Sequence, residues 1–133
     1  MVPAMLPALL GAWGNNQDAV KSTGPAPTTL SYAELQKAGN RVAARLAILL
    51  QPDGCSSASS PPAVALMATN SLETVIALTG LLHAGIPVAP INPAVRSADL
   101  EFLLADVSAA ALLVRPLRVG AGALHGPAHL ALL

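Results

Sequence analysis

Apolar residues recur in the first half of the chain at the spacing of a helix. Between 32 and 50 the residues of this repeat are Leu35, Ala38, Val42, Leu46 and Leu49. Ser31 and Glu34 precede the repeat at the spacing of a capping box, in which each side chain satisfies a backbone N–H at the other's position. The pattern predicts a helix over 32–50 that buries one face.

The second half of the chain contains three apolar runs without charged residues. "AVALMA" (63–68) and "AALLV" (110–114) are typical of strands that are covered on both faces, and "IPVAP" (86–90) indicates a further short strand. Two helices are expected between these strands. The first spans 71–84, with Asn70 or Ser71 as its cap and Gly85 as its end.

The second of these helices is expected to begin at "RSADLEFLLADV", with Ser97 as its cap. Its apolar residues predict a buried stripe made of Leu100, Leu103, Leu104 and Val107. From 32 to 114 the order is therefore α-β-α-β-α-β. The prediction is an α/β fold whose alternating helix-strand units form part of a mostly parallel three-layer sheet.

The longest charge-free stretch, 74–95, raises the question of a membrane segment. A bilayer-spanning helix needs about 20 apolar residues. Only Thr74–Ala84 can be one uninterrupted helix before Gly85 and Pro87 end it. We therefore predict helix, strand and loop here, and no membrane span.

The rest of the chain divides by composition. A short helix over 4–17 and an extended piece over 18–23 are expected before the first long helix. The segment 51–62 is linker-like, rich in serine and proline. We place one domain over 1–114, with 51–62 as an insertion, and a divergent, flexible tail over 115–133.

Composition and charge narrow the function classes. Hydrophobic residues make up 53% of the 133 residues, and seven basic residues balance seven acidic ones. A chain without a basic field or an aromatic platform is not expected to bind nucleic acid. The single cysteine, Cys55, excludes an internal disulfide. Without a convincing signal peptide, a cytoplasmic or peroxisomal location is expected.

Several segments in order resemble the N-terminal part of the AMP-forming acyl-CoA synthetases, the adenylate-forming superfamily. They are "LSYAELQKAGNRVAARL", "AVALMATNSLETVIALTGLLHAGIPVAPINP" and "SADLEFLLADVSAAALLV", which together cover about 29–114. The stretch 89–114 is most similar to the oxalate–CoA ligase and 4-coumarate–CoA ligase branch.

The resemblance implies an N-terminal portion of an ATP-dependent ligase that adenylates a carboxylic acid and then forms a CoA thioester. ATP, magnesium and CoA would serve the complete enzyme. The family's phosphate-binding loop and catalytic lysine would lie beyond residue 133, so we expect this chain alone to be inactive. We assign it no catalytic, cofactor-binding or metal-binding residue.

Two alternatives stay open. One is a non-catalytic interaction module or truncated isoform, with self-association through exposed sheet edges. The other is a small nucleotide-binding domain that uses the glycine-rich loop Gly120–Gly126, although no acidic residue follows that loop. His125 and His129 have a metal-ligand spacing without a third ligand nearby, and His83 is more simply a dipole partner at a helix end.

Overall fold

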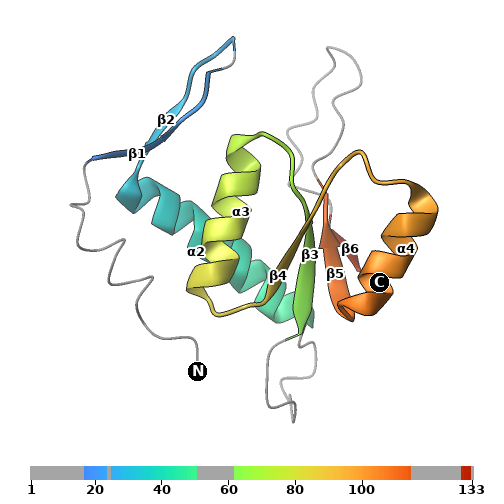
Figure 1. Cartoon of the computed structure of the whole chain (residues 1–133). Helices are drawn as coiled ribbons and strands as arrows, with labels where there is room; N and C mark the ends of the chain where they lie inside the picture. Colours follow the sequence, from blue (N-terminus) through green and yellow to red (C-terminus); the bar gives the residue numbers. More distant parts are fainter. Residues whose placement is uncertain (1–16, 24, 51–61, 115–129, 133) are drawn as a thin grey trace.

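The computed structural model describes residues 17–23, 25–50, 62–114 and 130–132 (Figure 1). Its elements, in chain order, are β1 (Asp18–Lys21), β2 (Thr29–Ser31), α2 (Tyr32–Leu50), β3 (Ala63–Met67), α3 (Leu72–His83), β4 (Val88–Ile91), α4 (Ser97–Asp106), β5 (Ala109–Leu113) and β6 (Leu130–Leu132). The alternation of helices and strands from α2 to β5 confirms the α/β fold class. Apart from Gln17, the helix predicted over 4–17 lies outside the described residues, and so does the linker-like segment apart from Pro62.

The main sheet has the strand order β4-β3-β5-β6. β3 pairs in parallel with β4, with Val64 opposite Val88, and in parallel with β5, with Leu66 opposite Leu113. β6 lies antiparallel to β5. The sequence pattern gave no strand at 130–132, within the tail expected to be flexible, whereas the structure pairs these residues with β5. A separate antiparallel pair, β1 and β2, leads into α2.

Helices cover both faces of the sheet, which gives three layers (Figure 1). α2 and α3 lie on one face, and α4 lies on the other. Successive side chains of a strand point to opposite faces. In β3, Val64 and Leu66 therefore face α2 and α3, while Ala65 faces the side of α4.

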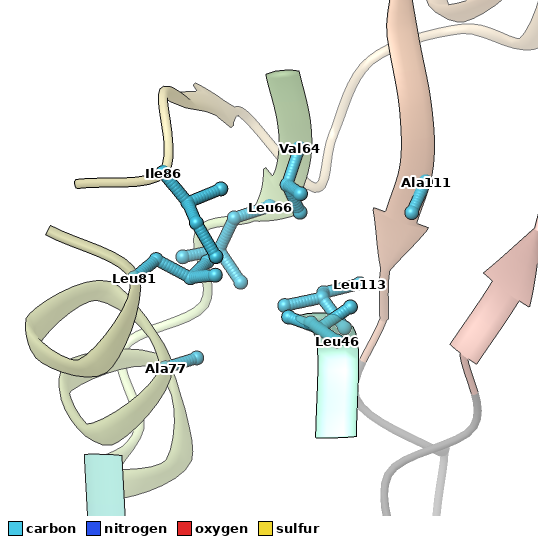
Figure 2. Packing of buried hydrophobic residues seen from close by; sticks show 8 residues of the cluster. All are labelled: Leu46, Val64, Leu66, Ala77, Leu81, Ile86, Ala111 and Leu113. Atoms are coloured by element: carbon cyan, nitrogen blue, oxygen red, sulfur yellow. The ribbon is translucent and has the colours of Figure 1, made fainter. Parts of the chain in front are cut away.

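The larger core cluster fills the space between the sheet and the α2–α3 pair (Figure 2). Its buried members are Leu46, Val64, Leu66, Ala77, Leu81, Ile86, Ala111 and Leu113. Among the described residues, Leu81 and Val64 are the largest fully buried side chains. Burying such a side chain contributes about 1.5–3 kcal/mol to the stability of the fold. The strands that the sequence predicts carry no charge because side chains of these strands are buried in this cluster.

α4 buries fewer of its residues than the sequence predicted. The second cluster contains Ala65, Ile91 and Leu112, and α4 adds only the half-buried Leu100 and Leu104. No residue of α4 itself is buried. The predicted buried stripe is therefore wrong for Leu103, which is exposed, and holds only in part for the other three. Phe102, at 69% exposure, points away from the sheet.

Two helix predictions also need correction at single residues. Ser97 does not cap α4: the cap position is Arg96, without a side-chain hydrogen bond, and Ser97 is the first helical residue. The Arg96 guanidinium instead binds the Asp99 carboxylate at 2.8 Å, and this pair is exposed. In α2, Leu49 is 42% exposed because α2 turns its Leu35 and Leu46 face to the core.

The capping box that begins α2 is confirmed. The Ser31 backbone N–H and hydroxyl donate to Glu34 Oε2 at 2.8 and 2.9 Å, and the Glu34 N–H donates back to Ser31 Oγ at 3.3 Å. These bonds, the backbone bond first, lower the pKa of the Glu34 carboxyl below its ordinary value. The charged form of Glu34 is thus the one that caps α2.

Gly85 ends α3 as the sequence predicted, in the left-handed region with φ +71°. The Gly85 N–H donates to the carbonyl of Leu82, and the Ile86 N–H donates to the carbonyl of Leu81. This pairing is a Schellman motif, and its apolar contact is the burial of Ile86 with Leu81. The following strand starts at Val88, two residues after the predicted start, because Ile86 belongs to the helix end.

β4 forms one edge of the sheet within the described residues, and Pro90 protects it. Pro87 and Ile91 accept hydrogen bonds from β3 and the residue after it through their carbonyls. Because backbone groups alternate sides along a strand, the Pro90 nitrogen faces the outer edge, where a proline removes one donor for another strand.

The helices of the described ranges are all too short or too polar to cross a bilayer.

The closest packing between described helices joins α2 and α3 at two glycines, Gly39 and Gly80. Both glycines are buried. A Cβ added to Gly39 would lie 2.8 Å from Gly80 Cα, and a Cβ added to Gly80 would lie 2.2 Å from the Gly39 carbonyl oxygen. The sequence pattern did not single out either residue. Only glycine at both positions allows the two helix backbones to touch.

We predict that Gly80→Ala destabilises the fold by about 1–3 kcal/mol, the usual cost of an overpacked core. Alanine in place of glycine favours a helix by about 1 kcal/mol, but the 2.2 Å overlap is with backbone atoms, which cannot rotate away, so α2 and α3 must move apart. Urea denaturation followed by circular dichroism measures the change. Ala47→Ser on the exposed face of α2 is the control; an equal midpoint for all three proteins would contradict the helix contact.

Gly85→Ala is expected to cost about 1 kcal/mol for a different reason, the positive φ of this residue. No atom lies within 4 Å of the added Cβ, so only the backbone conformation disfavours alanine. Ser108 stands shortly after the end of α4 with φ 49°, and Ser108→Gly should raise the denaturation midpoint. If both variants shift the midpoint in the same direction, backbone conformation does not govern these helix ends.

The Glu34 cap predicts a pH dependence. Since the folded-state pKa lies below the unfolded value of about 4.3, the carboxylate stabilises the fold above that value and loses this contribution as the pH falls through the folded pKa. Thermal melts between pH 7 and pH 3 should show a smaller decline for Glu34→Gln than for the unchanged chain. Parallel declines would show that the cap does not distinguish the charged form.

Candidate functional site

The carboxyl ends of β3, β4 and β5 are the place in this fold where a ligand would be expected. From β3 the chain passes through α3 to β4 on one side, then through α4 to β5 on the other side. The two helices lie on opposite faces (Figure 1). Open α/β sheets bind ligands at the carboxyl ends of their strands where the strand order reverses in this way.

Three hydroxyl groups gather directly after β3. Thr69 Oγ1, Ser71 Oγ and Thr74 Oγ1 lie 3.0 Å from one another in all three pairs. All three residues are half-buried. Ser71 is also the cap of α3, because its Oγ accepts a hydrogen bond from the Thr74 N–H at 3.3 Å. This hydroxyl cluster, Thr69–Ser71–Thr74, fixes the turn between β3 and α3.

The loop after β4 is held beside this turn. The Ala68 N–H donates to the Ile91 carbonyl at 2.8 Å, which extends the β3–β4 pairing beyond the end of β3. Asn92 Oδ1 then accepts a hydrogen bond from the Ala94 N–H at 2.9 Å. The sequence predicted helix, strand and loop over 74–95, and the structure places this loop after Ile91, the last residue of β4.

The hydroxyl cluster offers neutral donors and acceptors at a helix N-terminus and no acid–base group of its own. Across the described ranges, no group of three or more His, Cys, Asp or Glu residues could hold a metal ion. His83 is the last residue of α3, at the end opposite to Ser71. Its Nδ1 is buried without a hydrogen-bond partner. The hydroxyl cluster can therefore shape the turn and orient neighbouring groups by hydrogen bonding.

Several residues considered from the sequence lie outside the described residues. They are Cys55, the loop Gly120–Gly126, His125 and His129. The hydroxyl cluster was missed in part, since only Ser71 was considered as a helix cap. The run Thr69-Asn70-Ser71-Leu72-Glu73-Thr74 carries the signal that could have found it. Hydroxyl residues around a helix start commonly bond to one another and to the first backbone N–H groups.

Comparison with known proteins agrees with this architecture. The family model of the AMP-binding enzymes matches residues 12–131. The chain belongs to the AMP-binding enzyme family. Among curated relatives, surfactin synthase subunit 3 of Bacillus subtilis (strain 168) is 38% identical over 103 residues, a match that covers 73% of this chain and 8% of the relative. The chain thus spans under a tenth of that relative's length.

Solved structures support the same fold. The anthranilate CoA ligase AuaEII, in complex with anthranoyl-AMP, has a TM-score of 0.68 at 20% identity, over 84% of this chain and 20% of that chain. ATP-bound MatB from Rhodopseudomonas palustris has a TM-score of 0.68 at 23% identity, over 85% of this chain and 21% of that chain. These comparisons confirm the predicted resemblance to the N-terminal region of adenylate-forming enzymes. They do not distinguish an oxalate–CoA or coumarate–CoA ligase branch.

Proposed function

We propose that this chain forms the N-terminal scaffold of an ATP-dependent ligase that activates a carboxylic acid and transfers it to the thiol of CoA. The observation that carries the proposal is the AMP-binding family match over 12–131. The parallel order β4-β3-β5 and the likeness to AuaEII and MatB support it. The substrate class that the sequence favours is a carboxylic acid of the kind used by oxalate–CoA ligases and 4-coumarate–CoA ligases.

In the complete enzyme, a carboxylate oxygen of the acid would bond to the α-phosphorus of ATP. The bond from that phosphorus to the oxygen bridging to the β-phosphate would break, and pyrophosphate would leave. The CoA thiol, after losing its proton, would then attack the acyl carbon and release AMP. Negative charge develops on the phosphate oxygens in the first step, so catalysis requires cations or N–H donors aimed at them.

We place the ATP and magnesium sites of the complete enzyme outside the described residues. These residues lack a metal-ligand cluster. The hydroxyls of the Thr69–Ser71–Thr74 cluster already bond to one another at 3.0 Å. What the chain contributes is position: the α2–α3 contact at Gly39 and Gly80 holds α3 against the sheet, and the cluster fixes the turn at the carboxyl end of β3.

The purified chain is accordingly expected to form no acyl-adenylate. The assay is pyrophosphate release with ATP, magnesium and a panel of acids that includes oxalate, 4-coumarate and the common amino acids. Heat-inactivated chain is the control. Turnover above that control would contradict the scaffold role, because it would require a phosphate-binding group within these 133 residues.

A chimera tests the family assignment without relying on the absence of acyl-adenylate formation. This chain's matched segment would replace the corresponding 103-residue segment of surfactin synthase subunit 3. We expect ATP-dependent pyrophosphate exchange to persist at a reduced rate, and the same chimera with Gly80→Ala to lose most of it. A folded chimera with no exchange, beside an active parent, would contradict the proposed scaffold role.

A further inference from the structure

The outer face of α2 carries a row of three cations, which we call the basic row: Lys37, Arg41 and Arg45. All three residues are exposed. The buried residues of the same helix are Leu35, Gly39, Ala43 and Leu46. Positions four apart lie on one side of a helix, and the basic row lies on the side away from this buried face. Its charges extend over about 12 Å, at a rise of about 1.5 Å per residue.

The charges of the basic row are not neutralised by the rest of the described fold. In these ranges the one salt bridge joins Arg96 to Asp99, and the basic row takes part in no hydrogen bond or ion pair with another described residue. Three of the five Lys and Arg residues in the described ranges stand in this row, although the whole chain has a formal net charge of +0. Like charges four apart repel each other along a helix and destabilise it modestly. An anionic partner would remove that cost.

The surface next to the basic row is a shallow, open hollow with a mixed polar and apolar lining. A hollow of about 460 Å³ is lined, among the described residues, by Ala33, Gln36, Lys37, Asn40, Arg41 and Ala44. The two alanines leave space between the longer side chains. The Gln36 and Asn40 amides offer both donors and acceptors beside the cations. A protein surface with carboxylates in a row, and small or polar side chains between them, complements this face.

We propose that the basic row and its hollow form a docking surface for an acidic helix of another protein or domain, with carboxylates at every fourth position. The matching spacing aligns one carboxylate with each cation of the row. A free phosphate would contact one or two of these charges, because they are spread along the helix instead of converging on a point. Nucleic acid is disfavoured because the chain has a formal net charge of +0 and therefore lacks an extended basic field.

A second copy of this chain is a weaker occupant. The acidic residues of α4 are Asp99, Glu101 and Asp106. Asp99 is already bound to Arg96. Glu101 and Asp99 are two positions apart and so point to different sides of α4. The chain therefore offers no row of carboxylates in its described helices that matches the basic row.

The test uses the full chain and a fluorescein-labelled, alanine-based helical peptide of about six turns with glutamate at every fourth position. Fluorescence anisotropy at low salt should show saturable binding that weakens as salt is raised, since salt screens exposed charges. The same peptide with glutamine in place of glutamate should bind about tenfold more weakly or worse. Arg41→Gln should weaken binding of the acidic peptide about threefold, and Lys37→Gln/Arg41→Gln/Arg45→Gln about tenfold or more.

Matched variants identify the surface. Lys21→Gln removes an exposed cation of β1 that is not part of the basic row, and should leave binding unchanged. If the triple variant loses its cooperative melt, binding of the acidic peptide by the single Arg41→Gln variant tests the proposal instead. Equal binding of the glutamine peptide, or unchanged binding by a folded Arg41→Gln variant, overturns the proposal. So does full competition by inorganic triphosphate at equal charge concentration, or salt-sensitive dimers of the chain alone in sedimentation.

Discussion

The contact between Gly39 and Gly80 is the constraint on which the rest of the fold depends. The Cβ positions at these residues fall within 2.8 and 2.2 Å of opposing backbone atoms, so α2 and α3 can meet only if both side chains are absent. This close approach lets Leu46 and Leu81 enter one core cluster with the buried face of β3. A wider helix pair would leave space that these side chains cannot fill, and core voids cost stability.

The placement of α3 in turn positions the candidate site. Its N-terminus carries the Thr69–Ser71–Thr74 cluster at the carboxyl end of β3, and its C-terminus closes in the Schellman motif at Gly85. This helix thus links the helix contact, the core and the edge of the sheet where the candidate site lies. Membership in that family rests on the match over 12–131, and the reaction of the complete enzyme remains our proposal.

The two outer surfaces of the fold differ in chemistry. The outer face of α4 is exposed and includes Phe102, whereas the outer face of α2 exposes the basic row and the hollow beside it. Burial explains why the interior strands hold no charge, but it places no restriction on these outer faces. Their composition is therefore informative about contacts beyond this fold, and the basic row is the stronger signal because its charges lack partners among the described residues.

Local patterns in the sequence were sufficient for the elements and their order. The apolar repeat and the Ser31–Glu34 box predicted α2 with its observed bounds, and Ser71 and Gly85 marked the ends of α3. These features act within a few residues of each other, so the chain's own spacing reveals them. The ordered segments between 29 and 114 were also enough to indicate the family.

Only the tertiary structure decided which apolar face is covered, and by what. Leu49 and Leu103 have helical spacing but remain exposed, because α2 rotates toward α3 around Gly39 and because α4 meets the sheet mainly through Leu100 and Leu104. Arg96 rather than Ser97 occupies the cap of α4, and the Thr69–Ser71–Thr74 cluster became visible only once β3 and α3 were placed. In the sequence alone, a glycine within a helix indicates a less stable helix. The close contact that such a glycine permits depends on which backbone approaches it. Gly39 and Gly80 are 41 positions apart by number, and only folding brings their backbones into contact.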